Sequence, residues 1–302
     1  MKGKRFAALT LALSLTLAPG LTDAANSEKT MVDSQGNEVS FGHELPKAKT
    51  KGKETFDQPA EIENTTVADV FNEKGKKIGQ KKFEKNVEQK NKAEKKDKQK
   101  NKKNEEGELC ILFCGGGGDP GDGDGGTDPG AARVVTVFVA VDEEYRAAHS
   151  DWQTLTQNIV ENADNGFQRD HNIDFQVKAF GEWSSQGANA SEILQDLDRD
   201  WNGTGHDFLV GFTKDSNFNA GGIAYVYSSS PYGSAVSVNL DQGATNTWHA
   251  AQHEFSHNYG LGHVQQGSGV KCIMNYDYSY SVDYWHQSHD DQIQSNKGWY
   301  GN

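Results

Sequence analysis

Three histidines and one glutamate fall within the eleven residues HEFSHNYGLGH, which occupy positions 253–263. His253 and His257 are four residues apart, so on an α-helix they share one face and can bind the same metal ion. Gly260 can adopt the left-handed conformation that ends a helix, and the resulting turn would bring His263 back as a third ligand. Three neutral imidazoles leave one position open for water, as in a catalytic zinc site. Glu254 lies beside the first ligand, where it can act as general base toward a zinc-activated water.

The full pattern H-E-x-x-H-x-x-G-x-x-H is much more specific than H-E-x-x-H alone, which can occur by chance on a surface helix. It is followed by CIMNY at positions 272–276. Together the two motifs resemble the metzincin zinc endopeptidases, in which a methionine turn follows the zinc helix. The resemblance covers roughly residues 133–302 and implies that Met274 lies beneath the zinc ligands as an apolar base. It also implies peptide-bond hydrolysis with one catalytic zinc.

Two features point to different groups within the metzincins. The segments GGIAYVY and AVSVNLD, together with CIM, resemble the adamalysin or reprolysin group. Tyr276, two residues after the methionine, instead resembles the tyrosine of astacins and serralysins. That resemblance implies a tyrosine that can bind zinc and swing away to stabilise the transition state; the alternative is a packed tyrosine.

Strand and helix patterns alternate after Arg133 and must position this site. The order of the elements is β-α-β-α-β-β-β-α, which predicts a mainly parallel sheet covered by helices. We therefore expect an α/β (α+β) metzincin-like fold: a twisted five-stranded sheet with an antiparallel edge strand, packed by helices that include the zinc helix. The expected strands are 133–141, 173–180, 206–213, 221–227 and 234–240, and the expected helices are 152–170, 190–201 and 246–260.

The edge strand GGIAYVY is expected to bind an extended protein or peptide substrate by main-chain pairing. The segment SVDYWHQSHD is expected to shape one wall of the substrate pocket, with His286 and His289 as surface residues rather than ligands. His249 lies on the same helix face as His253 but one turn too far away to join the metal site.

The chain before residue 133 divides into three segments. Residues 1–25 combine a basic start, an apolar run and small residues, which is typical of a secretory signal peptide. Residues 26–114 are predicted to be a pro-segment, largely disordered, because 26–109 lack a core-forming pattern and 72–108 are rich in Lys and Glu. Residues 115–132 are a Gly- and Asp-rich linker, where we expect the proenzyme to be cut. The mature zinc metallopeptidase domain would be residues 133–302.

Charge is divided unevenly between these parts. Residues 1–130 hold 22 basic and 22 acidic side chains, whereas 131–302 hold 8 basic and 21 acidic ones. The acidic domain would be repelled by nucleic acid and by anionic membranes. No later segment is apolar enough to span a membrane, so we expect a secreted, extracellular protein. The sequence carries no oligomer signal, so a monomer is expected. The Asp-Gly alternation of the linker lacks the spacing of a calcium loop, so calcium is not indicated.

The three cysteines leave at least one thiol unpaired or intermolecular. Cys110 and Cys114 could pair with each other and leave Cys272 as a buried thiol. Alternatively, one could pair with Cys272 while the other binds zinc and keeps the proenzyme latent.

Two other functions stay open at this point. The domain could be a binding or adhesion module that keeps zinc for structure, although such a site has no need for Glu254. It could also be a zinc hydrolase that acts on another amide, such as a cell-wall peptide.

Overall fold

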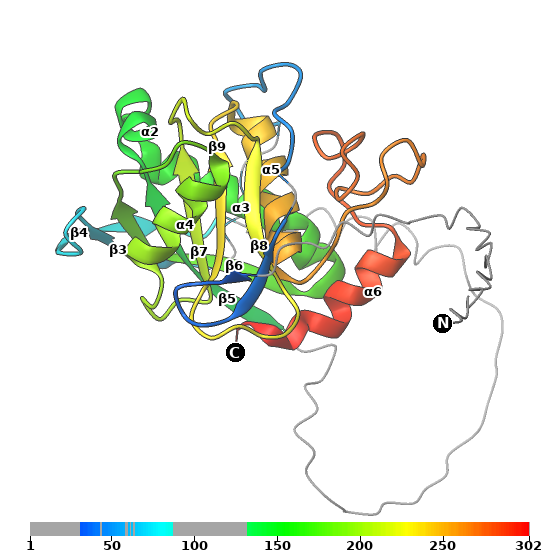
Figure 1. Ribbon diagram of the computed structural model, residues 1–302. Helices are drawn as coiled ribbons and strands as arrows, with labels where there is room; N and C mark the ends of the chain where they lie inside the picture. Colours follow the sequence, from blue (N-terminus) through cyan, green and yellow to red (C-terminus); the bar gives the residue numbers. More distant parts are fainter. Residues whose placement is uncertain are drawn as a thin grey trace, which may run out of the picture.

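A nine-stranded sheet runs through the described residues in the order β1-β2-β8-β9-β7-β5-β6-β3-β4 (Figure 1). This computed structural model describes residues 31–86, except 43, 58, 59, 61 and 63, and residues 132–301. The predicted signal peptide, the predicted linker up to residue 131 and both Cys110 and Cys114 therefore lie outside the described residues.

The five strands expected from the sequence form the middle of this sheet. Four of them are parallel neighbours, and the fifth, β8, is antiparallel to β9. Nearly every side chain of the central strands is buried, as expected for parallel strands that have helices on both faces. The strands are β5 (Arg133–Val141), β6 (Ile173–Glu182), β7 (Phe208–Thr213), β8 (Gly222–Tyr227) and β9 (Ala235–Leu240).

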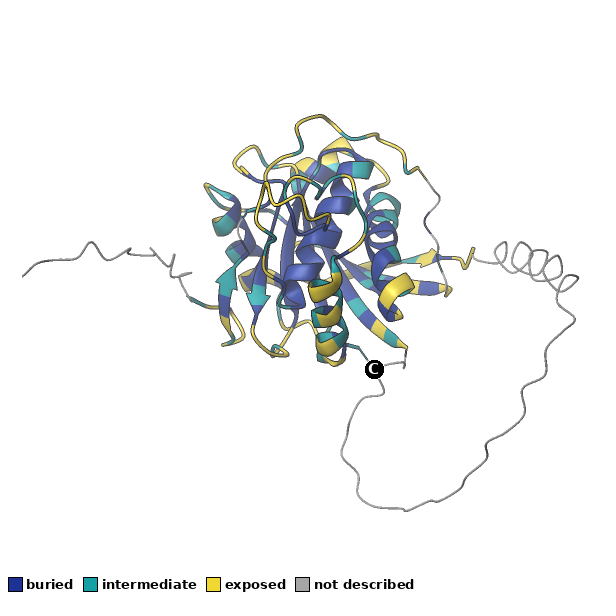
Figure 2. Ribbon diagram, turned by 90° about the vertical axis from the view of Figure 1, so that its right-hand side faces the viewer, coloured by how far each residue is buried: buried dark blue, intermediate teal, exposed yellow. Residues whose placement is uncertain are grey.

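Helices cover both faces of the sheet. On one face, Phe175 of β6 has its ring centroid 5.2 Å from that of Phe167 in α3 and 5.1 Å from that of Phe255 in α5. On the other face, Phe138 of β5 lies 4.9 Å from Trp201 of α4. Figure 2 shows α5 and the central strands mostly buried, whereas β4 at the edge of the sheet is largely exposed. The helices are α2 (Glu143–Ala148), α3 (Trp152–His171), α4 (Ala190–Trp201), α5 (Ala244–Asn258) and α6 (Gln287–Asn296), followed by the 3-10 helix η2 (Lys297–Trp299).

The prediction that residues 26–109 lack a core is wrong for residues 31–86, which we call the N-terminal segment. Its strands β1 (Met31–Val32) and β2 (Glu38–Phe41) extend the sheet beyond β8. Its strands β3 (Thr66–Phe71) and β4 (Lys77–Phe83) extend the sheet beyond β6. The apolar side chains of this segment become buried only against the rest of the chain, so no core pattern is visible in the segment by itself.

The expectation of a five-stranded sheet with an open edge at β8 is also wrong, because the sheet has nine strands among the described residues and β2 lies beside β8. Val39, Ser40 and Phe41 of β2 pair antiparallel with Tyr227, Val226 and Tyr225 of β8. The strand predicted to receive the substrate therefore already has a partner from the N-terminal segment. Within the described residues, no helix is both long and apolar enough to cross a membrane.

Candidate metal centre

Helix α5 places two of the predicted ligands on one buried face. His253 and Glu254 are 0% exposed and His257 is 1% exposed. The helix packs against β8 and β9, and the Asn258 amide donates to the carbonyls of Tyr225 in β8 and Val236 in β9 at 3.0 and 3.1 Å. This buried amide fixes the helix to the two strands, so the histidines have a rigid base.

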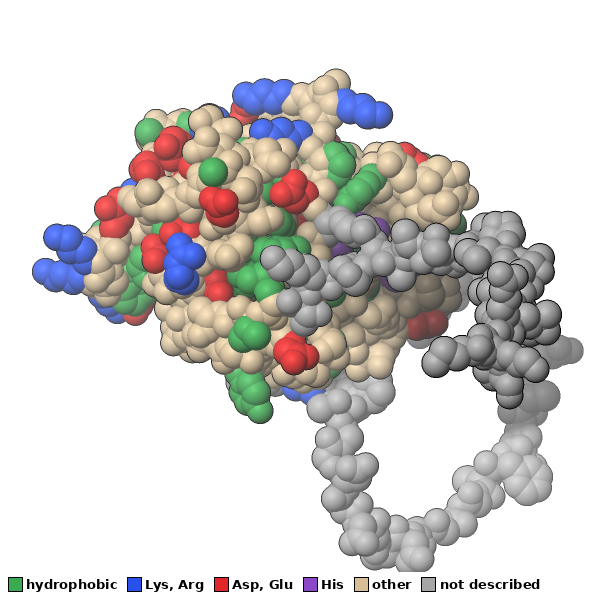
Figure 3. Space-filling model, viewed as in Figure 1, with side chains coloured by type: hydrophobic (Ala, Val, Ile, Leu, Met, Phe, Trp, Pro, Cys, Tyr) green, Lys and Arg blue, Asp and Glu red, His purple; other side chains and the backbone are tan. Residues whose placement is uncertain are grey.

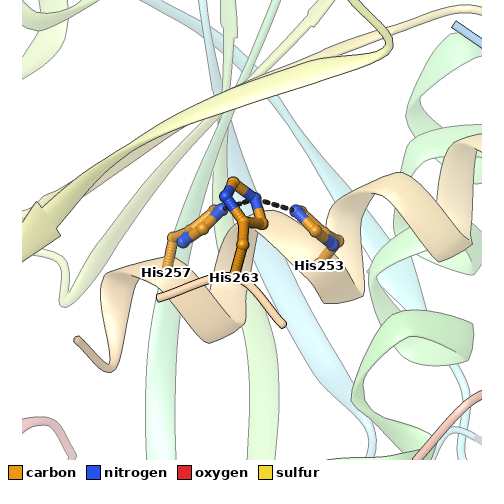
Figure 4. A group of neighbouring side chains, drawn as sticks. All are labelled: His253, His257 and His263. Carbon is orange, nitrogen blue, oxygen red and sulfur yellow. Dashed lines mark hydrogen bonds between the residues drawn. The ribbon is translucent and has the colours of Figure 1, made fainter. Parts of the chain in front are cut away.

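Gly260 ends the helix in the way that the sequence predicts. Its φ is +85°, a conformation that side-chain-bearing residues rarely adopt, and a Cβ added there would lie 2.9 Å from the Tyr227 carbonyl oxygen. The turn brings His263 back over the helix. Its Nε2 lies 3.1 Å from Nε2 of His253 and 3.0 Å from Nε2 of His257 (Figure 4).

The tautomers of the two helix histidines fit a metal. Nδ1 of His253 lies 2.8 Å from the Ile273 carbonyl oxygen, and Nδ1 of His257 lies 2.7 Å from that of Leu261. A carbonyl only accepts, so both Nδ1 atoms carry the proton and both Nε2 atoms present a lone pair. A metal ion bound by all three nitrogens would satisfy these lone pairs, and the carbonyls are the partners that orient metal-binding histidines.

The electrostatics of the site also favour neutral imidazoles. The pKa of His253 is lowered to about 3, mainly by burial and to a smaller extent by the neighbouring His263. A neutral imidazole is the form that binds a metal ion.

Glu254 is a buried carboxylate for which the described residues offer no hydrogen-bond partner to either oxygen. Burial raises the pKa of this carboxyl well above its usual value. Gly222 of β8 makes room for it, because a Cβ at that position would lie 2.4 Å from Oε1 of Glu254. An unsatisfied buried carboxyl group on the helix that carries two of three convergent imidazoles matches a site that holds a divalent cation.

The methionine turn contacts the centre through its backbone. Met274 is 0% exposed, and its carbonyl accepts from the Val264 amide at 3.0 Å, which fixes the backbone next to His263. The preceding carbonyl, that of Ile273, orients His253 as described above. The turn therefore positions two of the three ligands through its backbone.

Tyr276 also lies at the centre. Its hydroxyl is 3.5 Å from Nδ1 of His263, and the two ring centroids are 4.5 Å apart. The hydroxyl donates to the Glu44 carbonyl oxygen at 3.3 Å. Burial raises the pKa of Tyr276, and the nearby acidic groups of Glu254 and Glu44 raise it further. The phenol is therefore a hydrogen-bond donor at neutral pH.

Sequence reasoning missed the part of the N-terminal segment that lies over the centre. We call residues 38–42 together with 44 and 45 the covering segment. The Gly42 amide donates to the Ala224 carbonyl at 2.8 Å, and the Leu45 amide donates to the Gly222 carbonyl at 3.0 Å. A Cβ on Gly42 would lie 3.0 Å from the His257 ring, so glycine allows the backbone to pass directly over this ligand.

The chain beyond the covering segment stays attached to the same region. Residues 45–50 line a hollow together with Tyr276 and Tyr280. The Tyr280 hydroxyl donates to the Pro46 carbonyl at 2.8 Å, and the Asn246 amide donates to the Thr50 carbonyl at 2.8 Å. Figure 3 shows lysine side chains gathered at the top of the view, over the loop that continues from this contact.

His249 is placed as expected, outside the centre. Its Nδ1 lies 2.8 Å from the Thr245 carbonyl oxygen, and its ring stacks on Trp248. His286 and His289 were expected to be surface residues, but both are half-buried and lie beside the buried thiol of Cys272. No motif in the sequence joins these three residues.

A sheet whose five central strands are mainly parallel, together with a helix that contributes to a group of three convergent histidines, is typical of the zinc metallopeptidase class. The comparison with family models gives the particular family: the reprolysin-type model described as Metallo-peptidase family M12 matches residues 131–286. This match covers more than half of the chain, which therefore belongs to metallo-peptidase family M12. Membership supports a metzincin-type metalloprotease that hydrolyses peptide bonds and depends on zinc.

Comparisons with individual proteins add little. No curated protein matches the chain. A solved structure described as "Structure of a chaperone-substrate complex" aligns at 13% identity and a TM-score of 0.38, over 52% of this chain. The aligned part spans 29% of the length of that other chain, and a likeness this weak carries no argument.

Proposed function

We propose that the protein is a secreted zinc endopeptidase, made as a proenzyme, in which Glu254 is the general base. One observation carries the proposal. The carboxylate of Glu254 is buried without a partner among the described residues, and Glu254 follows His253, whose Nε2 converges with those of His257 and His263. A metal site kept only for structure has no need for such a carboxylate.

His253, His257 and His263 would hold the zinc, which when bound supplies Lewis-acid chemistry toward the scissile carbonyl and the attacking water. Next to a bound cation the Glu254 carboxyl would be ionised despite its burial, and it would take a proton from that water at one of its carboxylate oxygens. The water oxygen forms a bond to the carbonyl carbon, and the carbon–nitrogen bond of the peptide breaks. Glu254 would then deliver the proton to the leaving nitrogen.

Tyr276 would stabilise the oxyanion by donating a hydrogen bond from its hydroxyl. Its position supports this role, because the hydroxyl already donates to a main-chain carbonyl, that of Glu44. A substrate carbonyl in the same place would receive the same bond. This tyrosine is the astacin- and serralysin-like feature of a site whose zinc helix resembles the reprolysin group.

The substrate would bind as an extended strand antiparallel to β8. The covering segment supports this proposal, because β2 and Leu45 pair with β8 in that direction. Pairing through the backbone allows many sequences to bind, and side-chain pockets would then set the preference.

The same contacts support a proenzyme. The covering segment takes up the main-chain groups of β8 that a substrate needs, and Gly42 lies against His257. A chain in this state would have no room for a protein substrate. Secretion is proposed from the signal-peptide pattern of residues 1–25.

Maturation would begin with a cut in the linker, residues 115–132. Such a cut separates the N-terminal segment covalently, but strands β1–β4 would stay hydrogen-bonded to both sides of the sheet. Full activity would therefore also require the cut segment to dissociate or to be digested. N-terminal sequencing of the secreted form tests the site, since a first residue well inside the domain would contradict it.

The test of the proposed function is casein hydrolysis by the mature protein from the culture medium, with a chelator and after zinc is added back. We expect activity to be lost and then restored. Glu254→Gln should retain zinc and lower turnover by about 10²–10⁴-fold, the range for a general base. His257→Ala is the matched control, which should lose both zinc and activity.

Two outcomes would redirect the proposal. Wild-type turnover in Glu254→Gln would refute the role of Glu254. Zinc bound in the mature protein without hydrolysis of casein would favour a binding module or a hydrolase of another amide, and cell-wall peptides would be assayed next.

A further inference from the structure

A second group of metal-binding side chains lies outside the three-histidine centre. Cys272 comes from the methionine turn, His286 is the N-cap residue of α6, and His289 lies in the first turn of that helix. One ligand atom from each residue lies within 4.8 Å of the other two. We propose that Cys272, His286 and His289 form a second metal site, specific for zinc or a similar transition metal, that ties the methionine turn to α6.

The spacing of the donor atoms fits a metal ion. Sγ of Cys272 lies 3.5 Å from Nδ1 of His289. Typical zinc bonds of about 2.3 Å to sulfur and about 2.0–2.1 Å to nitrogen, at a tetrahedral angle, place the two ligand atoms roughly 3.5 Å apart. The pair therefore has the separation that a shared zinc ion requires.

His286 supplies an independent indication. Its Nδ1 is buried and has no hydrogen-bond partner among the described residues. Its other ring nitrogen, Nε2, lies 2.6 Å from the Ser288 hydroxyl oxygen. A metal-binding histidine is typically oriented in this way, with one nitrogen on the metal and the other on a hydrogen-bond partner. A metal ion at the group would satisfy the buried Nδ1.

A simple thiol–imidazole hydrogen bond explains the group less well. Such a bond would join Cys272 to His289 and leave Nδ1 of His286 buried and unsatisfied, which costs about 1–3 kcal/mol. The two imidazole rings are also close, with centroids 4.3 Å apart. A cation between the three residues would account both for the contact of Cys272 with His289 and for the unsatisfied nitrogen of His286.

The donor set selects the class of metal. A thiolate and two imidazoles suit zinc and other transition metals, whereas calcium and magnesium prefer oxygen ligands. The nearest acidic residue on the helix, Asp290, is engaged elsewhere, with its Oδ1 3.1 Å from Nε2 of His171.

The protonation of the group is consistent with metal binding. Burial, followed by the adjacent His286, lowers the pKa of His289 to about 4, so this imidazole is neutral at neutral pH. Burial raises the pKa of Cys272, while hydrogen bonds from the backbone of His286 and Met274 act in the opposite direction. A metal ion would displace the thiol proton, and the same backbone hydrogen bonds would stabilise the metal-bound thiolate.

The place of the group in the fold indicates its role. Cys272 immediately precedes Ile273, whose carbonyl orients His253 in the first centre. A metal ion held by Cys272 and α6 would therefore brace the backbone that positions a catalytic ligand. The second site would be structural, and its loading would raise the melting temperature.

The test measures metal directly and needs no peptidase activity. The full-length chain is prepared with Cys110→Ser and Cys114→Ser, so that Cys272 is its one thiol. Metal analysis after saturation with zinc and gel filtration should give about two ions per chain. With cobalt in place of zinc, a thiolate-to-cobalt charge-transfer band should appear in the near ultraviolet, because the three-histidine centre contains no sulfur.

Three variants in that background separate the two sites. Cys272→Ser and His289→Asn should each lower the content to about one ion per chain and abolish the band. His257→Ala should lose the other ion and keep the band. His206→Asn, a half-buried histidine outside both groups, is the matched control and should retain both ions.

Since Cys272→Ser could perturb the buried turn, His289→Asn decides the question if the first variant does not fold. A parent protein without the band would overturn the proposal, as would a metal content that neither variant changes. Either result would leave Cys272 and His289 as a hydrogen-bonded pair only.

Discussion

The N-terminal segment covers both outer strands of the five-stranded catalytic sheet, but the two covers differ. At β6, strand β3 pairs in parallel over Asp69, Val70 and Phe71, and the β3–β4 hairpin buries Ala68, Val70 and Phe83. At β8, strand β2 is only four residues long, and Val39 is its one fully buried side chain. The first cover adds the buried side chains of a whole hairpin to the hydrophobic core, whereas the second adds a single short strand next to the metal centre.

This difference indicates that one segment can have two separate roles at the two edges of the same sheet. We expect the cover at β6 to control stability and the cover at β8 to control access to the site. Substitutions placed at the two edges can separate the two effects.

The largest expected effect is on stability, at the β6 edge. Phe83→Ala removes a ring whose centroid lies 5.9 Å from that of Phe180 in β6. Loss of a buried phenylalanine lowers the free energy of unfolding by about 3–5 kcal/mol. Urea unfolding of the full-length chain measures it. A loss below about 1 kcal/mol would show that this cover is not part of the core.

The next effect is on activity, at β8. Gly222→Ala places a methyl group 2.4 Å from the position of Oε1 of Glu254, so the carboxylate must move. A displacement of this size at the reacting groups costs about 10²-fold in turnover. Turnover of the activated protein and its zinc content are measured together, and zinc should be retained. Unchanged turnover would mean that the position of Glu254 is not critical.

The matched glycine at the other edge is Gly181 in β6. A Cβ there would lie 2.7 Å from Cε1 of Phe138, which is a core ring and not part of the site. Gly181→Ala should lower stability by about 1–3 kcal/mol through overpacking. Turnover of the folded, activated protein should equal that of the wild type. A loss of turnover comparable to that of Gly222→Ala would erase the distinction between the edges.

A smaller effect is expected when the cover at β8 is loosened. Val39→Asp puts a carboxylate in a position that is 1% exposed, which costs about 1–3 kcal/mol if no partner is found. Part of this lost stability would shift the covering segment toward an open position that exposes the site. Casein hydrolysis by the uncut full-length chain should therefore rise about tenfold. Val32→Asp in β1, where the side chain is 60% exposed, is the control and should change nothing. Equal activity in both variants would contradict blockage by the covering segment.

The smallest effect concerns an ion pair that joins the hairpin turn to the catalytic domain. Arg146 Nη2 lies 2.8 Å from Oε1 of Glu73, whose side chain is 50% exposed. Glu73→Gln should lower stability by less than about 1 kcal/mol, because exposed pairs contribute little. High salt should give the wild type a similar loss. A larger loss would mean that this contact, rather than the apolar core, holds the hairpin.

The sequence predicted the central strands and the zinc helix because their signals are local. Spacings of four and three residues and one glycine define the positions of His253, His257 and His263, and the structure brings all three together. The convergence of Tyr276 with His263 is also readable, since the methionine turn is a short and recognisable motif.

The N-terminal segment was not predicted because its signal is not local. The sequence TVADVF does alternate, and Gly75, with a φ of +68°, ends the turn of a hairpin. The strand that follows, KIGQKKF, is exposed along most of its length, so the Lys-rich composition suggested disorder. What stabilises both strands is a partner, β6, about 100 residues further on. The group of Cys272, His286 and His289 was not predicted for the same reason. Cys272 lies in the methionine turn, and the two histidines come from the start of α6, further along the chain.

The pairing of the segment at β8 has a consequence for the order in which the chain folds. The Asn37 side chain donates to the Tyr232 carbonyl, 195 residues further along the sequence. Contacts between such distant residues form slowly, and during synthesis this one has to wait until most of the chain has been made. Val39 pairs with Tyr227, so its side chain stays exposed until that part of the chain has been made. Blockage of the site would be among the last steps of folding.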